Sequence, residues 1–412
     1  MGPIALFDKS FLQSLKLDES VWFDNFFLTN ICPLFYIETL ADLEKTGIKG
    51  RSTEAEVRII ASKFPPMNSG PCAHHRDLCL ASLLGYDVPM IGQIPLAQSR
   101  IVMHEGRPNV VAGESPVAAA YSRWQEERYL EVERLFAKIW RSALAKIDLG
   151  KTAELYRVLG VDPKSCNSLE QALSLAQAVT EETAHSDVRL EFALSLLDID
   201  PEDRPPIAER WGTSGAPSIV VFSPYAAFVL SVLVFFNIAL AAGLISTKRP
   251  SNFVDIAYLF YLPFCMIFIS SDRLHRRTAR LFLREDQEFV WGLDLKNALG
   301  EINQHFSNFP DSEKEKGLAG FARTPPDGVG ELVTQLWDNH LPRWREPKKR
   351  SADADDQFEK IVAKVKQMEQ AETAVIDPKS FQVKDVESVA MRRVVRRKRG
   401  SWYQIPKDVG ED

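Results

Sequence analysis

Short apolar runs alternate with helical patterns near both ends of residues 1–310. Residues 3–7 form an apolar run that ends in Asp8, and residues 265–269 and 288–291 form two similar runs. Their length and sharp boundaries predict buried strands rather than helices. Helices are expected at residues 9–15, 20–28, 34–45, 253–262, 273–283 and 294–306. Strands separated by helices predict an α/β fold with a parallel sheet and right-handed crossovers.

The middle of the chain has a different pattern. Helical spacing dominates residues 51–200, with a predicted β-hairpin at residues 100–104 and 109–111. The helices expected here cover residues 54–63, 77–84, 116–147, 168–182 and 187–197. We therefore divide the chain into a sheet domain in two parts, a mainly helical insert with a small hairpin, and a charged tail that is helical or disordered. The boundaries are 1–48 and 206–310 for the sheet domain, 49–205 for the insert and 311–412 for the tail.

One stretch lacks charge altogether. The 37 positions 211–247 contain no acidic or basic residue, and residues 226–245 have the length of a membrane span. If only this segment crossed a membrane, Asp8 and Glu38 would lie on the opposite side from Asp255 and Asp272. If a second span followed, Asp255 would lie inside it, at a cost of about 2.5–3.5 kcal/mol. We favour a core helix surrounded by protein. The alternative is a protein anchored in the inner membrane by residues 226–245.

The charge distribution separates an acidic body from a basic tail. The chain has 50 Lys and Arg against 56 Asp and Glu, a net charge of −6. Residues 343–412 contain 17 basic and 13 acidic residues, a net +4, so residues 1–342 carry −10. Five cysteines, an odd number in a long chain, do not indicate a disulfide framework, and a cytoplasmic protein is expected.

The tail contains a candidate nucleic-acid-binding segment. Its basic residues are Arg392, Arg393, Arg396, Arg397, Lys398 and Arg399. Trp402 and Tyr403 follow directly, and cations beside aromatic rings suit phosphate contacts combined with base stacking. The alternative interpretation is a solvated tail. Upstream, the spacing of Ile361, Val365 and Met368 predicts one amphipathic helix.

Four acidic residues are the candidate catalytic groups. Asp8 and Asp272 directly follow predicted strands, and the active crevice of an open parallel sheet lies at the carboxyl ends of its strands. Glu38 lies on the helix predicted at 34–45, and Asp255 lies in the first turn of the helix before the Asp272 strand. Carboxylates gathered in one cleft repel one another, and Mg²⁺ or Mn²⁺, which prefer oxygen ligands, would offset that repulsion.

The sequences around these acids resemble those of a known family. Ile-Ala-Leu-Phe-Asp-Lys-Ser at 4–10, Pro-Leu-Phe-Tyr-Ile-Glu-Thr-Leu at 33–40, and the segments 252–257 and 265–272 are similar to the acidic elements of the PIN-like nuclease family. The chain resembles a large-insert bacterial-type member. The resemblance covers about residues 1–48 and 217–307, and a gap of over two hundred residues between Glu38 and Asp255 departs from compact members.

The resemblance implies a three-layer α/β/α domain and a metal-dependent endoribonuclease. It implies that Asp8, Glu38, Asp255 and Asp272 are the catalytic metal ligands for Mg²⁺ or Mn²⁺, with Ser10 and Ser271 as supporting hydroxyls. RNA is the expected substrate, ahead of DNA, and an antitoxin or other protein regulator is a possible partner. A catalytically silent PIN-like protein that binds nucleic acid is the second alternative.

Each acid also has a purely structural interpretation. Asp8 fits the N-cap of the helix at 9–15, Asp255 fits a cap shared with Asn252, and Asp272 fits a first helical turn. Glu38 fits an exposed helical position. Four acids in the order and contexts of one family favour the catalytic interpretation.

Two further patterns are expected to be structural. Cys72, His74, His75 and Cys79 include types of zinc ligand, but no second Cys/His pair lies nearby, so a loop and a helix with a buried Cys79 are expected. In the helix predicted at 116–147, an apolar stripe is expected to be core. Its members are Tyr129, Leu130, Leu135, Phe136 and Ile139.

Overall fold

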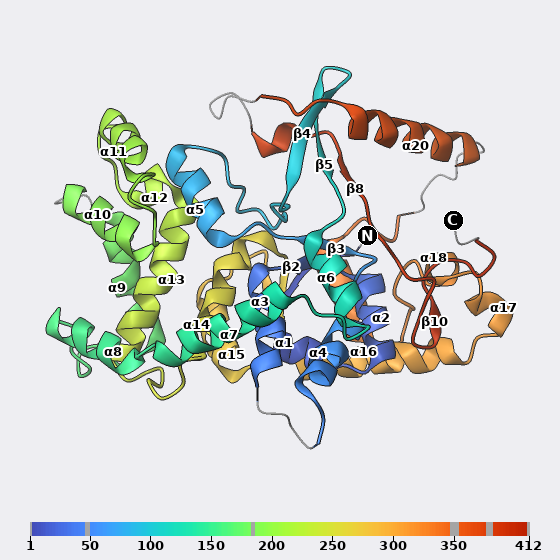
Figure 1. The fold of residues 1–412 in the computed structure, drawn as a ribbon, viewed down its shortest axis with the longest axis horizontal. Coiled ribbons are helices and arrows are strands. Elements are labelled where there is room, and N and C mark those ends of the chain that lie inside the picture. The colour runs from blue at the N-terminus through green and yellow to red at the C-terminus, as the bar shows by residue number, and fades with distance from the viewer. Residues whose placement is uncertain (1, 46–49, 183–185, 347–353, 376–381, 410–412) are drawn as a thin grey trace.

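The computed structural model describes residues 2–45, 50–182, 186–346, 354–375 and 382–409 and has a parallel sheet at its centre (Figure 1). The sheet has five strands in the order β3–β2–β1–β6–β7, and every neighbouring pair is parallel. The strands are β1 (Ile4–Phe7), β2 (Leu28–Ile31), β3 (Ser69–Pro71), β6 (Ile267–Ser270) and β7 (Glu288–Trp291). The fold is therefore α/β, as the sequence predicts.

Two of these strands were not predicted. The expected strands at β1, β6 and β7 are confirmed, but β2 and β3 lie in segments assigned to helix or loop. Because β3 pairs with β2, the sheet domain extends into the segment predicted to be the insert. The predicted boundary at residues 48 and 49 itself lies outside the described residues.

Short helices connect the strands and pack around the sheet. Asp8 ends β1 and caps α1, because its side chain accepts the Phe11 backbone N–H. The helix predicted at 253–262 is instead one α-helical and one 3₁₀ segment, and the latter contains Pro263. The elements are α1 (Lys9–Ser14), α2 (Leu17–Phe26), α3 (Pro33–Leu40), η1 (Ala41–Glu44), α14 (Asn252–Ala257), η2 (Tyr258–Phe264), α15 (Arg273–Thr278), η3 (Ala279–Leu281) and α16 (Gly292–Ser307).

The middle of the chain is mainly helical and carries the predicted hairpin. The single helix expected at 116–147 is wrong: it is two helices, separated by a turn in which Glu127 has a positive φ. The elements are α4 (Thr53–Ser62), α5 (His75–Leu84), β4 (Ser99–His104), β5 (Arg107–Ala112), α6 (Pro116–Trp124), α7 (Glu131–Lys146), α8 (Leu149–Val158), α9 (Leu169–Glu181), α10 (Ser186–Leu196), α11 (Arg204–Thr213) and α12 (Ile219–Phe222).

The uncharged stretch contains one long helix, α13 (Pro224–Ala241). Among the described residues it is the one helix that is long and apolar enough to cross a membrane, and most of its residues are buried inside the protein. It packs against α5, α8, α9 and α12. Its polar groups have partners, since Asn237 donates to the Tyr156 hydroxyl and Tyr225 donates to the Phe260 carbonyl. This packing agrees with the core-helix interpretation.

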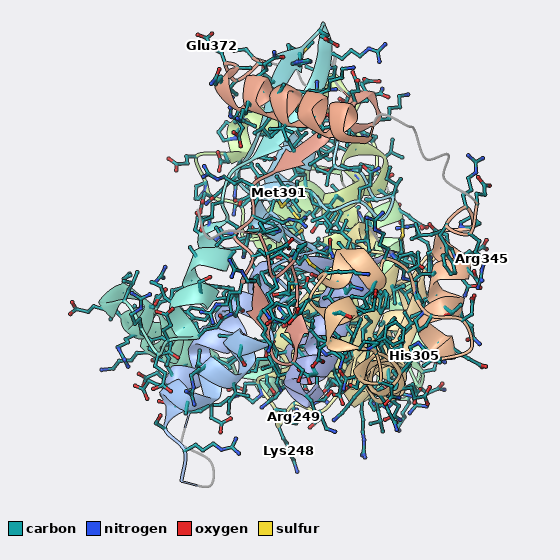
Figure 2. The ribbon with its side chains drawn as sticks, turned by 90° about the vertical axis from the view of Figure 1, so that its right-hand side faces the viewer. Lys248, Arg249, His305, Arg345, Glu372 and Met391 are labelled. Atoms are coloured by element: carbon teal, nitrogen blue, oxygen red, sulfur yellow. The ribbon has the colours of Figure 1, made fainter. Side chains whose placement is uncertain are left out.

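The C-terminal segment is folded onto the body where the structure describes it. The predicted amphipathic helix is α20, and Met368 on it packs with Val102 and Val111 of the hairpin. Met391 of β8 lies between α20 and the body of the molecule (Figure 2). Trp402 is 1% exposed and bonds to Asn303. The elements are α17 (Asp311–Lys314), α18 (Leu318–Phe321), α19 (Glu331–His340), α20 (Ala354–Gln370), η4 (Val383–Asp385), β8 (Val389–Met391), β9 (Lys398–Arg399) and β10 (Trp402–Tyr403).

Candidate functional site

Asp8 lies at the carboxyl end of β1 and is 3% exposed. Its Oδ1 accepts the Phe11 backbone N–H at 2.9 Å. Its Oδ2 accepts from the Ser10 hydroxyl at 2.6 Å and from the Ser270 hydroxyl at 2.8 Å, and His275 Nδ1 lies 3.3 Å away. Both oxygens are therefore engaged within the protein.

His275, on α15, links Asp8 to Asp255. Its Nε2 lies 2.6 Å from the Asp255 carbonyl oxygen, which can only accept, so Nε2 carries a hydrogen. Its Nδ1 lies 2.8 Å from Ser270 Oγ, whose one hydrogen is donated to Asp8, so Nδ1 carries a hydrogen too. With both nitrogens protonated the ring is a cation. Although burial lowers the pKa of His275, its bond to Asp8 and the charges of Asp8 and Asp255 outweigh this and raise that pKa to about 9.

Asp272 and Ser271 follow β6, and Ser10, the other predicted supporting serine, lies on α1. Asp272 is the N-cap of α15, and its Oδ1 accepts the Leu274 backbone N–H at 2.6 Å. Ser10 supports Asp8 directly, as expected. Ser271 acts through its backbone, whose N–H donates to Ser10 Oγ at 3.2 Å. Gly292 packs closely here: a Cβ on it would lie 2.3 Å from Ser271 Oγ and 2.9 Å from a ring carbon of Phe11, so a larger residue would displace these side chains.

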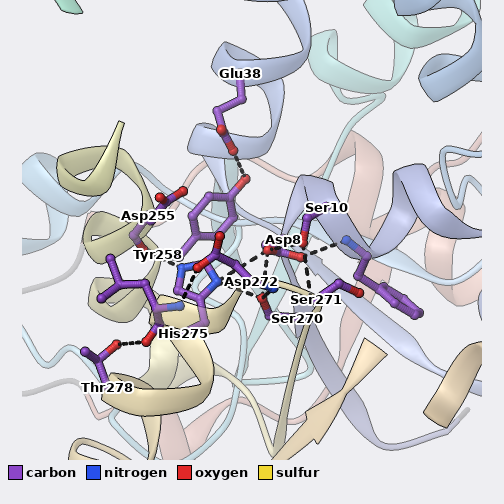
Figure 3. Close-up of polar contacts among 12 residues, drawn as sticks. Asp8, Ser10, Glu38, Asp255, Tyr258, Ser270, Ser271, Asp272, His275 and Thr278 are labelled. Carbon is purple, nitrogen blue, oxygen red and sulfur yellow. Dashed lines mark hydrogen bonds and ion pairs between the residues drawn. The ribbon is translucent and has the colours of Figure 1, made fainter. Parts of the chain in front are cut away.

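Asp255 and Glu38 lie around the same site, together with Tyr258 (Figure 3). The Tyr258 hydroxyl donates to Glu38 Oε2 at 2.5 Å, which anchors that carboxylate to η2. No hydrogen bond from any residue that the structure describes reaches the side-chain carboxylate of Asp255. Asp255, Asp272 and Glu38 are all partly exposed, whereas Asp8 is buried. The structure thus brings the four predicted acids to one place.

The ionisation of these acids reflects their crowding. Burial raises the pKa of Asp255 to about 7, and the charges of Asp272 and Glu38 add to this against the opposing effect of His275. Burial also raises the pKa of Glu38, helped by the charges of Asp8 and Asp42. Burial tends to raise the pKa of Asp8. The hydrogen bond from His275, the positive charge of His275 and the hydrogen bond from Ser10 together outweigh burial, so the pKa of Asp8 is lowered.

The donor chemistry of the site suits a hard divalent cation. Asp255, Asp272 and Glu38 present carboxylate oxygens, and the charges of Asp272 and Glu38 help to raise the pKa of Asp255, a repulsion that Mg²⁺ or Mn²⁺ would relieve. Among the described residues, no three acidic, histidine or cysteine side chains are already grouped as a metal-binding set. Asp8 is the least available of the four, because internal donors occupy both its oxygens.

A group of exposed basic residues beside the acids was not singled out for RNA contact from the sequence. Arg273, Arg276 and Arg277 lie on α15, next to the Asp272 cap. Arg277 donates to the Leu244 carbonyl, so α15 adjoins the loop that carries Lys248 and Arg249. Both loop residues project from the surface in Figure 2. The sequence did contain a signal for this group, because Arg273, Arg276 and Arg277 follow closely after β6.

The basic cluster of residues 392–399 is partly structural. Arg399 is 7% exposed, pairs with Asp24 at 3.3 Å and donates to the Phe64 and Ser20 carbonyls. Its predicted role in nucleic-acid binding is therefore wrong, because buried partners occupy its guanidinium group and leave it inaccessible to a nucleic acid. Arg393 bonds to the Met67 carbonyl, Arg396 pairs with Glu126, and Arg397 donates to the Val409 carbonyl. Arg392 and Lys398 remain exposed.

The structure decides both of the patterns expected to be structural. Cys79 is buried on α5, as expected, and His75 bonds to the Tyr261 hydroxyl. Most of the apolar stripe is not core. Leu130 is 48%, Leu135 56%, Phe136 39% and Ile139 57% exposed, so the expectation is wrong for these four, whereas Tyr129 is partly buried and packs against the core. Instead, α7 turns Glu133 and Ala137 inward, because Glu133 accepts from Arg123 and Trp124.

Comparison with protein-family models, with curated proteins and with solved structures found no match to this chain.

Proposed function

We propose that this protein is a PIN-like, metal-dependent endoribonuclease that hydrolyses RNA phosphodiester bonds at the carboxyl edge of its sheet. The observation that carries the proposal is the meeting of four acids from distant parts of the chain. Asp8 and Asp272 follow the two adjacent strands β1 and β6, and Asp255 and Glu38 flank them. The position of these acids at the carboxyl ends of parallel strands is the one that the resemblance of the surrounding sequences to the PIN-like family implies.

The residues of the site have distinct roles in this proposal. Asp255, Asp272 and Glu38, with Asp8, would hold Mg²⁺ or Mn²⁺, which when bound would activate a water molecule and stabilise the leaving oxygen. Tyr258 holds Glu38, and Ser10 and Ser270 hold Asp8. His275 fixes the distance between β1 and α14 by bonding to Asp8 and to the Asp255 carbonyl.

RNA binding is assigned to the exposed cations beside the acids. Arg273 and Arg276 lie on α15, which Asp272 caps, and the charge of Arg249 acts on Asp255, so we assign these cations, with Lys248 of the same loop, to the phosphates around a scissile bond. Arg392 and Lys398, which are exposed in the C-terminal segment, supply a second set. We therefore expect affinity for single-stranded RNA to fall as salt rises, because phosphate contacts release counterions.

The test is cleavage of a fluorescent single-stranded RNA by purified protein with Mg²⁺ or Mn²⁺. Asp255→Asn is the test variant because this carboxylate is partly exposed and supports no other side chain. Asp311→Asn, an exposed acid in the first turn of α17, is the matched control. The proposal requires cleavage by the wild type and by the control, and none by Asp255→Asn. Equal cleavage by all three, or none by any, would contradict it.

A specific observation favours a second candidate, a catalytically silent nucleic-acid-binding protein. Asp8 is fully bonded to internal donors and has a cationic histidine beside it, so the protein itself neutralises this acid. In that case wild type and Asp255→Asn would bind RNA equally in a salt-dependent manner, and neither would cleave it.

A further inference from the structure

A large cavity lies at the amino ends of the strands, whereas the four acids lie at the carboxyl ends. It has a volume of about 860 Å³, within the range of small-molecule sites. Asn25, Met67 and Asn68 form one wall, and they precede β2 and β3, so the cavity adjoins the amino ends of these strands. Residues of α18, α19 and the segments that follow them form the other wall.

The charged groups that line this cavity are cationic. Arg323 and Arg343 are the charged side chains of the lining, which contains no acidic residue although the chain as a whole is acidic. Arg323 and Arg343 are exposed, and neither is paired with a carboxylate among the described residues. Two acids are bonded to lining residues but do not pair with Arg323 or Arg343: Glu288 accepts from His340, and Asp338 accepts from Trp344. An anion entering the cavity would therefore meet unpaired guanidinium groups.

The rest of the lining is aromatic and apolar. Trp337 and Trp344 pack edge to face with ring centroids 5.4 Å apart. Each is held in place, since Trp337 donates to the Phe26 carbonyl and Trp344 donates to Asp338. Arg345, at the outer edge of the molecule in Figure 2, stacks on Trp344 at 4.3 Å. Met67, Leu341 and Pro342 add apolar surface. Fixed indole rings beside arginines suit a planar base linked to a phosphate.

We propose that this cavity binds a nucleoside monophosphate, with the base against Trp344 and the phosphate between Arg323 and Arg343. The volume is far larger than a free phosphate needs, and an uncharged aromatic ligand would leave the two arginines without a counterion. Asn25 and Asn68 donate their amide hydrogens to the Ala322 and Asp24 carbonyls, which leaves their own oxygens to accept from a base amino group. This site is separate from the carboxylates at the carboxyl ends of the strands.

The experiment is calorimetric titration of the full chain with AMP, adenosine and inorganic phosphate, without divalent cations. AMP should bind at least about 10-fold more tightly than either fragment, because a charged hydrogen bond and a stacked base each contribute a factor of that size. Arg323→Gln with Arg343→Gln should weaken AMP binding about 10-fold or more and leave adenosine binding unchanged. Trp344→Leu should weaken AMP and adenosine alike by about 10-fold or more.

Two controls keep the result specific. Arg280→Gln removes an exposed arginine remote from the cavity and should leave AMP binding unchanged. Asp255→Asn should also leave it unchanged, whether or not RNA cleavage is found. The proposal is overturned if AMP does not bind at concentrations up to about 1 mM. It is also overturned if phosphate binds as tightly as AMP, if the double arginine variant retains full affinity, or if Asp255→Asn loses it.

Discussion

Asp24 and Asp255 are two acids affected by burial, but only the carboxylate of Asp24 has hydrogen-bond and ion-pair partners among the residues that the structure describes. Burial raises the pKa of both. Asp24 is 0% exposed, accepts from the Met67 and Asn68 backbone N–H groups, and pairs with Arg399. Asp255 is partly exposed, and no described residue donates a hydrogen bond to its carboxylate. A raised pKa alone therefore does not mark a functional acid. The proposed function assigns catalysis to Asp255, the acid whose burial no hydrogen-bond donor among the described residues offsets.

The largest expected effect is the loss of chemistry when Asp255 is changed. If metal ions contribute several kcal/mol of transition-state stabilisation, Asp255→Asn should lower the rate of RNA cleavage by about 10³-fold or more. Chelation of divalent cations should abolish wild-type cleavage, and added Mn²⁺ should restore it. Single-turnover kinetics with and without chelator measure both. Cleavage that survives chelation would separate any activity from this site.

The second effect is on stability, and its sign should differ between the two acids. Asp24→Asn leaves Arg399 buried without its counterion and should lower the free energy of unfolding by about 3–5 kcal/mol. Asp255→Asn should raise it above pH 7, because a carboxylate with a raised pKa costs stability once it is charged in the folded state. Urea denaturation of both variants at about pH 8 measures the difference. A loss of stability in Asp255→Asn would show that this acid is structural.

A third effect follows from His275. Because its pKa is raised from 6.5 to about 9, the ring stabilises the fold fully below about pH 6.5, and the contribution is lost as pH rises through about 9. The shift corresponds to about 3 kcal/mol. At the acidic end, the lowered pKa of Asp8 makes stability fall as pH drops below about 4. The measurement is the pH dependence of unfolding in urea, with His275→Gln as the comparison. A wild-type profile flat between about pH 6.5 and 9 would refute the ion pair.

The smallest effect concerns the apolar stripe on α7. Ile139 is 57% exposed, so Ile139→Gln should change the free energy of unfolding by no more than about 0.5 kcal/mol. Ala137, on the inward face of the same helix, is 0% exposed, and Ala137→Leu should cost about 1–3 kcal/mol through overpacking. Thermal or urea unfolding of the two variants compares them. A larger loss of unfolding free energy from Ile139→Gln would show that the stripe is part of the core.

The sequence predicted the strands that are apolar and missed those that are held by polar contacts. The β1 and β6 segments are continuous apolar runs, whereas β2 contains Thr29 and Asn30. Both are buried because their side chains bond to the Asn68 and Phe264 carbonyls. Only the folded sheet supplies those acceptors, so the hydrophobic pattern could not reveal β2. The β3 strand is three residues long and includes Gly70 and Pro71, which are typical of turns.

The candidate site shows the same division. Asp8 and Asp272 were found because they follow strands, a signal that lies in the local sequence. His275 was missed because its partners are Asp8 and the Asp255 carbonyl, contacts made only after β1 and β6 pair. The burial of Arg399 was missed for the same reason, since Asp24 lies 375 positions earlier in the chain. Charge runs in a sequence do not tell which members find buried partners.

The most direct test of the central claim is anomalous diffraction from crystals of the wild type soaked in Mn²⁺. We predict Mn²⁺ density between Asp255, Asp272 and Glu38, with Asp8 adjacent, and its disappearance in crystals of Asp255→Asn. Crystals without Mn²⁺ density at these carboxylates, at a concentration that supports RNA cleavage by other metal-dependent nucleases, would contradict the account of this edge of the sheet as a metal-dependent active site.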